Sequence, residues 1–221
     1  MTLIVAAACQ RGIVVGADSA WIRPGGVVHE PGGKLHVIGG CLVSISGLIE
    51  RRSGIDGRLV ASLPQTLNAM APTPLSREHL PAVAATVGEM WREHYQGARI
   101  LPGSGVETSL MFWWADWTLS HFEIRPAEVT PVRHVDMRQM GLCPYALQGR
   151  WDVQQIVEAG KLSQRARVFL DAGRGIASGF GDALAFVRDV QAAAAREMPD
   201  VGGDLDVRMV RATDGGVETL A

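Results

Sequence analysis

Cysteine is scarce in this sequence, and patterns that bind metals are missing. Three cysteines occur among 221 residues, widely spaced and without a CxxC pair, which excludes a disulfide framework and the usual zinc spacing. The six histidines form neither an HExxH motif nor a helical i, i+4 pair. A chemistry that needs no metal is therefore expected. The cysteines are Cys9, Cys41 and Cys143.

The sequence also lacks long apolar runs and basic patches. It has no run of about eighteen apolar residues, and its N-terminus has no basic start followed by an apolar core and a cleavage site. The net charge is -2, and the longest basic cluster is the pair Arg51 and Arg52, which is too short for nucleic-acid binding. A cytoplasmic protein without membrane or nucleic-acid partners is expected. With 47% hydrophobic residues, the chain is expected to form one domain over 1–221.

What the sequence does contain is a small hydroxyl residue directly after Met1. Enzymes that remove the initiator methionine act when the next residue is small, so we expect a mature chain that begins with Thr2. An N-terminal threonine carries a hydroxyl and an amine, and a terminal amine has a pKa of about 7.7 to 8.0. The amine is partly neutral at cell pH and can serve as the base for the hydroxyl. Thr2 is therefore a candidate nucleophile that needs no histidine.

Two apolar strand pairs carry residues that would assist Thr2. TLIVAAA and GIVVGADS read as a hairpin joined by the turn CQRG, and its second strand ends at Asp18. GGKLHVI and CLVSIS form a second pair that begins with Lys34. If both pairs lie in one sheet, Lys34 would lower the pKa of the threonine hydroxyl and amine, and Asp18 would hold Lys34 in place. Gly47, which closes SISG, is a candidate to turn its N–H toward an oxyanion.

These motifs resemble the signature of proteasome β subunits and of the bacterial HslV-like peptidases. The similar strings are G-x-V-x-G-A-D-S around Asp18, G-G-K-L around Lys34 and S-x-S-G-L around Gly47. Asp18 and Lys34 follow Thr2 by sixteen and thirty-two residues, as in the family, whereas Gly47 comes about one residue early and implies a one-residue loop deletion. The resemblance covers residues 2–50. Its length makes the chain most similar to the branch of betaproteobacterial proteasome homologues.

The resemblance implies a threonine endopeptidase that hydrolyses peptide bonds through an ester on Thr2, without a cofactor or metal. It also implies stacked homo-oligomeric rings of six or seven subunits, of which seven is favoured, that enclose the active sites. A ring-shaped ATPase unfoldase would control the access of peptides or unfolded proteins. By analogy with the family, an apolar specificity pocket would be lined by Trp21, His36, Ile45 and Ile49.

Periodicity predicts the remaining elements. Helices are expected at 48–63, where Pro64 would end the helix, from the cap Ser76 to His94, at 152–158, 163–170 and 182–198. Strands are expected at 108–114, 118–124, 129–140, 145–148 and 205–211, followed by a tail. Tryptophans 113, 114 and 117 are assigned to the core or to subunit contacts. This order is typical of an α+β fold, the four-layer αββα sandwich of N-terminal-nucleophile hydrolases, with a helical insertion around 150–181.

The second half departs from the family pattern. The family has a G-S-G string whose serine supports the amine; here LQG places Gln148 at that position, and ASG with Ser178 is the competing string. An acid and a serine usually precede the glycine pair of the last strand. Here REMPDVGGDLDV offers Glu197 or Asp200 and no serine. The sequence leaves open which residues orient the amine.

Two alternative functions stay open. The same type of fold can hydrolyse a small amide, in which case a monomer or dimer with an open cleft is expected. A catalytically silent ring or binding scaffold would keep the fold without the chemistry, and a retained Met1 would favour it because methionine blocks the amine.

Overall fold

Most of the chain is described by a computed structural model, and the description covers the strands and helices on which the site depends. The described residues are 3–23, 26–29, 33–53, 58–97, 107–138, 145–148, 162–171, 179–198 and 201–220.

The first sheet is built around the N-terminal hairpin. Its strands run antiparallel in the order β12-β1-β2-β13-β14. Every residue of β1 and β2 is buried, which explains why their sequences are continuous apolar runs rather than alternating ones. The last strand, β14, was predicted only as a tail. The strands are β1 (Ile4–Cys9), β2 (Gly12–Ala17), β12 (Tyr145–Gln148), β13 (Asp206–Arg211) and β14 (Val217–Leu220).

The second sheet contains the second predicted strand pair. Its order is β11-β10-β9-β6-β5, again antiparallel. The predicted hairpin over 108–124 is confirmed. Of the strand predicted at 129–140, the described residues up to 138 are a regular strand only at Arg133–Asp136. The strands are β5 (Leu35–Ile38), β6 (Cys41–Ser46), β9 (Thr108–Trp113), β10 (Thr118–Ile124) and β11 (Arg133–Asp136).

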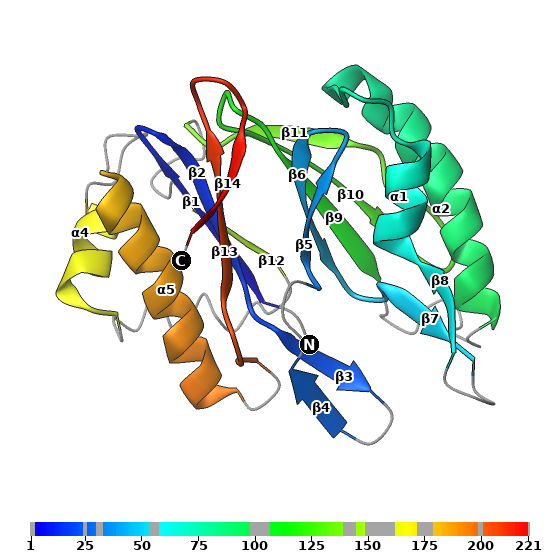
Figure 1. Cartoon of the computed structure of the whole chain (residues 1–221), viewed down its shortest axis with the longest axis horizontal. Helices are drawn as coiled ribbons and strands as arrows, with labels where there is room; N and C mark the ends of the chain where they lie inside the picture. Colours follow the sequence, from blue (N-terminus) through cyan, green and yellow to red (C-terminus); the bar gives the residue numbers. More distant parts are fainter. Residues whose placement is uncertain are drawn as a thin grey trace.

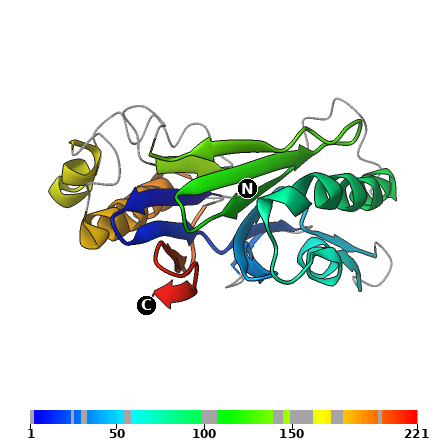
Figure 2. The same ribbon diagram turned by 90° about the horizontal axis from the view of Figure 1, so that it is seen from above.

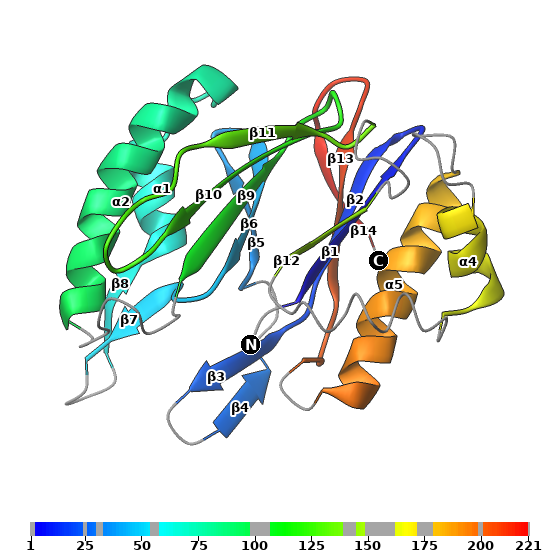
Figure 3. The ribbon, with the colours of Figure 1, turned by 180° about the vertical axis from the view of Figure 1, so that it is seen from behind.

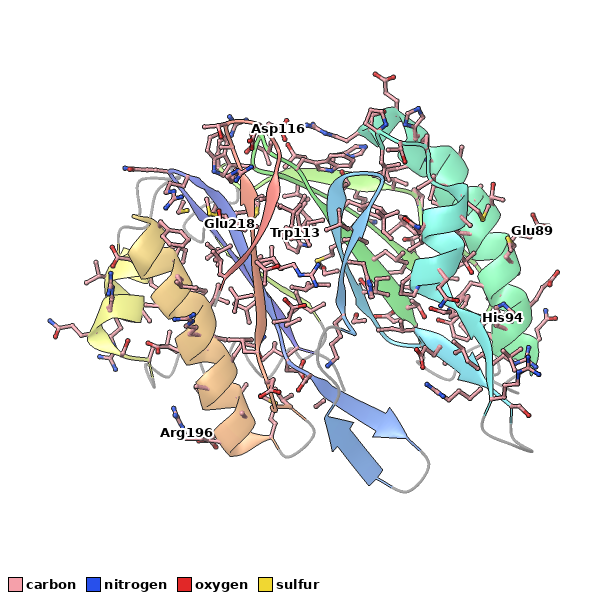
Figure 4. The ribbon with its side chains drawn as sticks, viewed as in Figure 1. Glu89, His94, Trp113, Asp116, Arg196 and Glu218 are labelled. Carbon is pink, nitrogen blue, oxygen red and sulfur yellow. The ribbon has the colours of Figure 1, made fainter. Side chains whose placement is uncertain are left out.

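The two predicted hairpins therefore lie in different sheets, and the premise that they share one sheet is wrong. The strands β1, β2 and β6 are buried on both faces, so each packs one face against the other sheet and one against helices (Figures 1 and 2). The edge strand β5 exposes Val37. Between the sheets, Ile4, Ala6 and Val15 contact a cluster that includes Leu42 and Trp113. Trp113 lies between the sheets in Figure 4, as expected for a core residue.

Helices cover the outer face of each sheet. The long helix α5 packs on β1 and β2, with Phe186 and Val190 in the shared core. On the other side, α1 and α2 cover the second sheet, where Trp91 and Phe112 are buried. Figures 1 and 3 show the order helices, sheet, sheet, helices across an α+β molecule. The helices are α1 (Leu63–Met70), η1 (Arg77–His79), α2 (Leu80–Gly97), α4 (Gln164–Asp171) and α5 (Phe180–Glu197).

The helix predicted at 48–63 is wrong. This stretch contains β7 (Glu50–Arg52) and β8 (Leu59–Ser62), and α1 begins at Leu63. Pro64 thus lies in the first turn of α1 rather than beyond a helix end. Proline is favoured there because the first helical N–H groups have no partner within the helix and its fixed φ fits.

The other predicted helices are confirmed where the structure describes them, at η1 with α2, at α4 and at α5. The helical piece at 152–158 lies outside the described residues, so the insertion around 150–181 stays a prediction. Two further strands, β3 (Ala20–Arg23) and β4 (Gly26–His29), form a small hairpin directly after the end of β2 (Figure 1). Within the described residues, no helix combines the length and apolar character needed to cross a membrane.

Candidate active site

Asp18 is the residue on which the site converges. It directly follows β2, where the strand end lies beside the start of β1. Its Oδ1 accepts a hydrogen bond from the backbone N–H of Leu3 at 2.7 Å, and its Oδ2 accepts one from the N–H of Ala20 at 3.1 Å. Asp18 is only 4% exposed. Its carboxylate is therefore fixed by two backbone donors from both sides of the strand end.

Lys34 reaches the same carboxylate from the other sheet. It directly precedes β5, and its Nζ lies 2.9 Å from Asp18 Oδ1. Both side chains are 2% exposed, so this is a buried ion pair that links the two sheets. The lysine ammonium and the Leu3 N–H bind one and the same oxygen atom. The expected meeting of Asp18 and Lys34 is thus present, although it is made between sheets.

Gly47 lies just beyond β6, at the same end of the second sheet as Lys34. The N–H of Ile45 donates to the Lys34 carbonyl at 2.9 Å, which sets this register. Gly47 has φ of +95°, and a Cβ there would overlap the Glu107 carbonyl oxygen. Only glycine fits both the backbone angle and this close approach. Its backbone is exposed, as a donor for an incoming group must be.

Thr2 lies outside the described residues, but Leu3, to which it is covalently joined, is firmly held. The Leu3 carbonyl accepts from the Asp18 N–H at 3.3 Å. The next residue, Ile4, is paired with Gln148 of β12. This register places Leu147 and Gln148 of the LQG string beside the N-terminal end of β1. Ser178, in the competing string, lies outside the described residues.

The predicted pocket residues fall into separate environments. Ile45 and Ile49 are fully buried together in the cluster beneath α1 and α2. His36 is half-buried, its Nε2 lies 3.2 Å from the Gly33 carbonyl oxygen, and its pKa is lowered mainly by burial. Trp21 lies in β3 opposite Val28, and its side chain is outside the described residues.

One residue close to the site was missed by the sequence reading. Gln191 of α5 is 5% exposed, and its Nε2 donates to the carbonyls of Leu3 at 3.1 Å and of Gly16 at 3.2 Å. The available signal was a single polar residue between Val187 and Ala194 on an otherwise apolar helix face.

The glycine pair of the last strand also lies near the site. The Ser19 N–H donates to the Gly202 carbonyl at 3.1 Å. Of the acids proposed from the sequence, Glu197 is exposed and Asp200 lies outside the described residues. A cavity of about 150 Å³ lies here, with Asp18, Gln191 and Gly202 among its lining residues.

A reactive thiol and a metal site are both absent from the described part of the chain. Burial raises the pKa of the Cys41 thiol to about 12, and that of Cys9 is also raised, so both thiols stay protonated and unreactive. No group of three or more His, Cys, Asp or Glu side chains within the described ranges is arranged to hold a metal ion.

Two facing antiparallel sheets carry helices on their outer faces and a buried ion pair at one end, and solved structures share this fold. The helical assembly of the Anbu complex from Pseudomonas aeruginosa aligns with a TM-score of 0.58 at 16% identity, over 99% of this chain and 85% of that one. Anbu (ancestral beta-subunit) from Yersinia bercovieri aligns with a TM-score of 0.56 at 15% identity, over 99% and 87%.

A mutant Anbu from Hyphomicrobium sp. strain MC1 aligns with a TM-score of 0.55 at 14% identity, over 99% of this chain and 85% of that one. No protein-family model and no curated protein matches the sequence. At these identities the likeness shows a shared fold.

Proposed function

We propose that this chain is a threonine endopeptidase whose nucleophile is Thr2, exposed when Met1 is removed. The observation that supports it best is the oxygen shared by the Lys34 ammonium and the Leu3 N–H on buried Asp18. A buried cation is thereby held beside the residue that follows Thr2. A purely structural ion pair has no need to bind the backbone of Leu3, the residue directly before β1.

The reaction needs one hydroxyl, one amine and one oxyanion donor. The Thr2 Oγ attacks the peptide carbonyl carbon while its proton passes to the Thr2 amine. The N–H of Gly47 stabilises the tetrahedral oxyanion. The C–N bond then breaks, the leaving amine takes the proton, and an ester remains on Thr2. Water attacks this ester, gives a proton to the amine, and the ester bond breaks as the Thr2 hydroxyl is restored.

Lys34 and Asp18 prepare Thr2 for this role. The Lys34 charge favours the ionised hydroxyl and the neutral amine, because a cation stabilises a nearby anion and repels a second cation. Asp18 orients Lys34 and compensates its charge in the buried site. We propose that substrate side chains meet an apolar pocket near Trp21 and His36, with Ile45 and Ile49 behind it in the core cluster beneath α1 and α2.

The fold and assembly that accompany this function are also proposals. We assign the chain 1–221 to one four-layer αββα domain with a helical insertion around 150–181, in the branch of betaproteobacterial proteasome homologues. The Anbu complex of P. aeruginosa forms a helical assembly. Here we propose stacked homo-oligomeric rings, seven-fold rather than six-fold, that receive unfolded chains from a ring ATPase in the cytoplasm.

Intact-mass spectrometry before and after treatment with a threonine-directed β-lactone or peptide epoxyketone tests the proposal. We expect loss of the Met1 mass and one covalent adduct per chain. The Thr2→Ala variant is the matched control and should form none. Retained Met1 without an adduct would refute the peptidase and leave the silent scaffold.

Sedimentation velocity on the same sample separates the two enzymatic readings. A large homo-oligomer that forms the adduct and cleaves an unfolded protein supports the endopeptidase. A monomer or dimer that forms the adduct but leaves proteins intact would instead indicate a small-amide hydrolase.

A further inference from the structure

The buried side-chain amide of a residue near the C-terminal end of the chain hydrogen-bonds Leu3, which directly precedes β1. Gln191 lies on α5, and its Nε2 hydrogen-bonds the Leu3 carbonyl across 188 positions of sequence. The same nitrogen lies 3.2 Å from the Gly16 carbonyl oxygen. A side chain of the outer helix layer therefore binds the backbone at the start of β1 and near the end of β2.

The helix can approach this closely because of Gly16. A Cβ at Gly16 would overlap the side chain of Val187, one turn before Gln191 on α5. The missing side chain lets α5 lie close to β2, so that the short glutamine amide reaches backbone carbonyls. The contact therefore depends on two residues, Gly16 in β2 and Gln191 on α5.

Leu3 is consequently held at both of its backbone polar groups. Its N–H donates to Asp18 Oδ1, and its carbonyl accepts from Gln191 Nε2 and from the Asp18 N–H. We propose that Gln191 is a positioning residue that fixes Leu3 and, through it, the reacting atoms of Thr2. This inference rests on the proposed function of Thr2.

Packing alone does not account for a glutamine at this position. Gln191 Oε1 is the buried side-chain atom that has no hydrogen-bond partner within the described ranges. A buried amide with an unpaired acceptor is less favourable than leucine or methionine, which the rest of this helix face would accept. The feature that glutamine supplies and an apolar residue does not is the donor on Leu3.

The first test compares Gln191→Met with Val190→Ala. Methionine keeps the length of the side chain and removes the donor. Val190→Ala weakens the apolar cluster that also contains Leu3 but removes no hydrogen bond to Leu3. Reaction with the β-lactone is followed at saturation, where the first-order constant kinact is measured on fully folded protein. We expect kinact to fall at least tenfold in Gln191→Met, because small misplacements of reacting atoms are that costly. In Val190→Ala, kinact should stay within twofold of the wild type while Tm falls.

Gln191→Glu makes the proposed contact with Leu3 depend on pH. The pH dependence of kinact then distinguishes positioning of Leu3 from a purely structural role. The protonated carboxyl can donate to Leu3 as the amide does, but the ionised form repels the Leu3 carbonyl and the Asp18 carboxylate. We expect kinact of this variant to approach the wild-type value at low pH and to be lost as the pH rises. A profile parallel to the wild type would contradict the inference.

Amide exchange of Leu3, measured by NMR on protein labelled with 15N-leucine, tests the positioning without any catalysis. Exchange should be at least tenfold faster in Gln191→Met than in Val190→Ala. Equal exchange in the two variants would overturn the inference, even if the wild type forms the adduct. If the wild type forms no adduct, the proposed peptidase fails, and this exchange comparison alone decides whether Gln191 holds the N-terminal strand.

Discussion

At the scale of single residues, the site depends on how one carboxylate is shared. Asp18 satisfies the backbone of Leu3 and Ala20 and also compensates the charge of Lys34. Charged groups buried to this degree are stable only when paired and hydrogen-bonded. Each partner therefore depends on the other, and removing one changes both stability and the proposed chemistry.

Lys34→Met should separate the charge from the packing. The methionine retains much of the apolar stem but leaves Asp18 as an uncompensated buried anion, so we expect a loss of about 3 to 5 kcal/mol in the free energy of unfolding and no β-lactone adduct. Urea denaturation measures the first effect. The double variant Asp18→Asn with Lys34→Met removes both charges and should recover at least about 1 kcal/mol while staying inactive. A double variant less stable than Lys34→Met would show that the pair is not coupled in this way.

At the scale of elements, the ends of strands matter more than their centres. Asp18, Lys34 and Gly47 each lie one residue outside a regular strand. The last backbone hydrogen bonds of the strand pairs fix Asp18 to Leu3 and Lys34 to Ile45. The strand centres are filled with apolar side chains that set the spacing of the layers. Rigid strands thus hold the reactive groups on short, well-defined turns.

Gly47→Ala tests the turn after β6, with Gly40→Ala as the matched control. Both glycines have positive φ, +95° and +85°, so alanine is strained at both by about 1 to 2 kcal/mol. A Cβ at Gly40 meets open space, whereas one at Gly47 overlaps the Glu107 carbonyl oxygen. We expect Gly47→Ala to be the less stable variant by at least about 1 kcal/mol in urea denaturation, with slower β-lactone reaction. Equal losses would mean that the turn relaxes away from Glu107.

At the scale of the whole molecule, the half formed by the second sheet and α2 contains several histidines that prefer to be neutral. Burial is the main cause that lowers the pKa values of His36, His94 and His121 below 6.5. In the unfolded chain these side chains regain their ordinary pKa and bind protons more readily. Protons therefore favour the unfolded state in the range just below pH 6.5.

The stability of the whole domain should accordingly fall as the pH drops below about 6.5, because the unfolded state then binds more protons than the folded state. Urea denaturation between pH 7.5 and pH 5 measures the slope. Replacing His36, His94 and His121 by glutamine one at a time should reduce the slope stepwise, and the triple variant should have the flattest profile. A triple variant as acid-sensitive as the wild type would assign the effect to other groups.

The sequence alone determined much of the local structure and supplied the candidate site residues. Continuous apolar, β-branched runs predicted β1, β2, β5 and β6. Asp18 and Lys34 were expected to meet on the premise of a single sheet, and they meet between two sheets. The apolar face of 182–198 predicted α5. The strand and helix predictions succeed because they depend on side chains a few residues apart.

Only the tertiary structure decided how the elements combine. A strand buried on both faces has no polar side to show which sheet it joins, so the two hairpins were wrongly expected in one sheet. Proline can stand just after the end of a helix or in its first turn. Because β8 occupies the residues up to Ser62, Pro64 lies in the first turn of α1. Gln191 carries no local sign of the residue it binds, because its partner Leu3 is 188 positions away. Long-range packing, rather than any sequence pattern, brings that amide to the strand that follows Thr2.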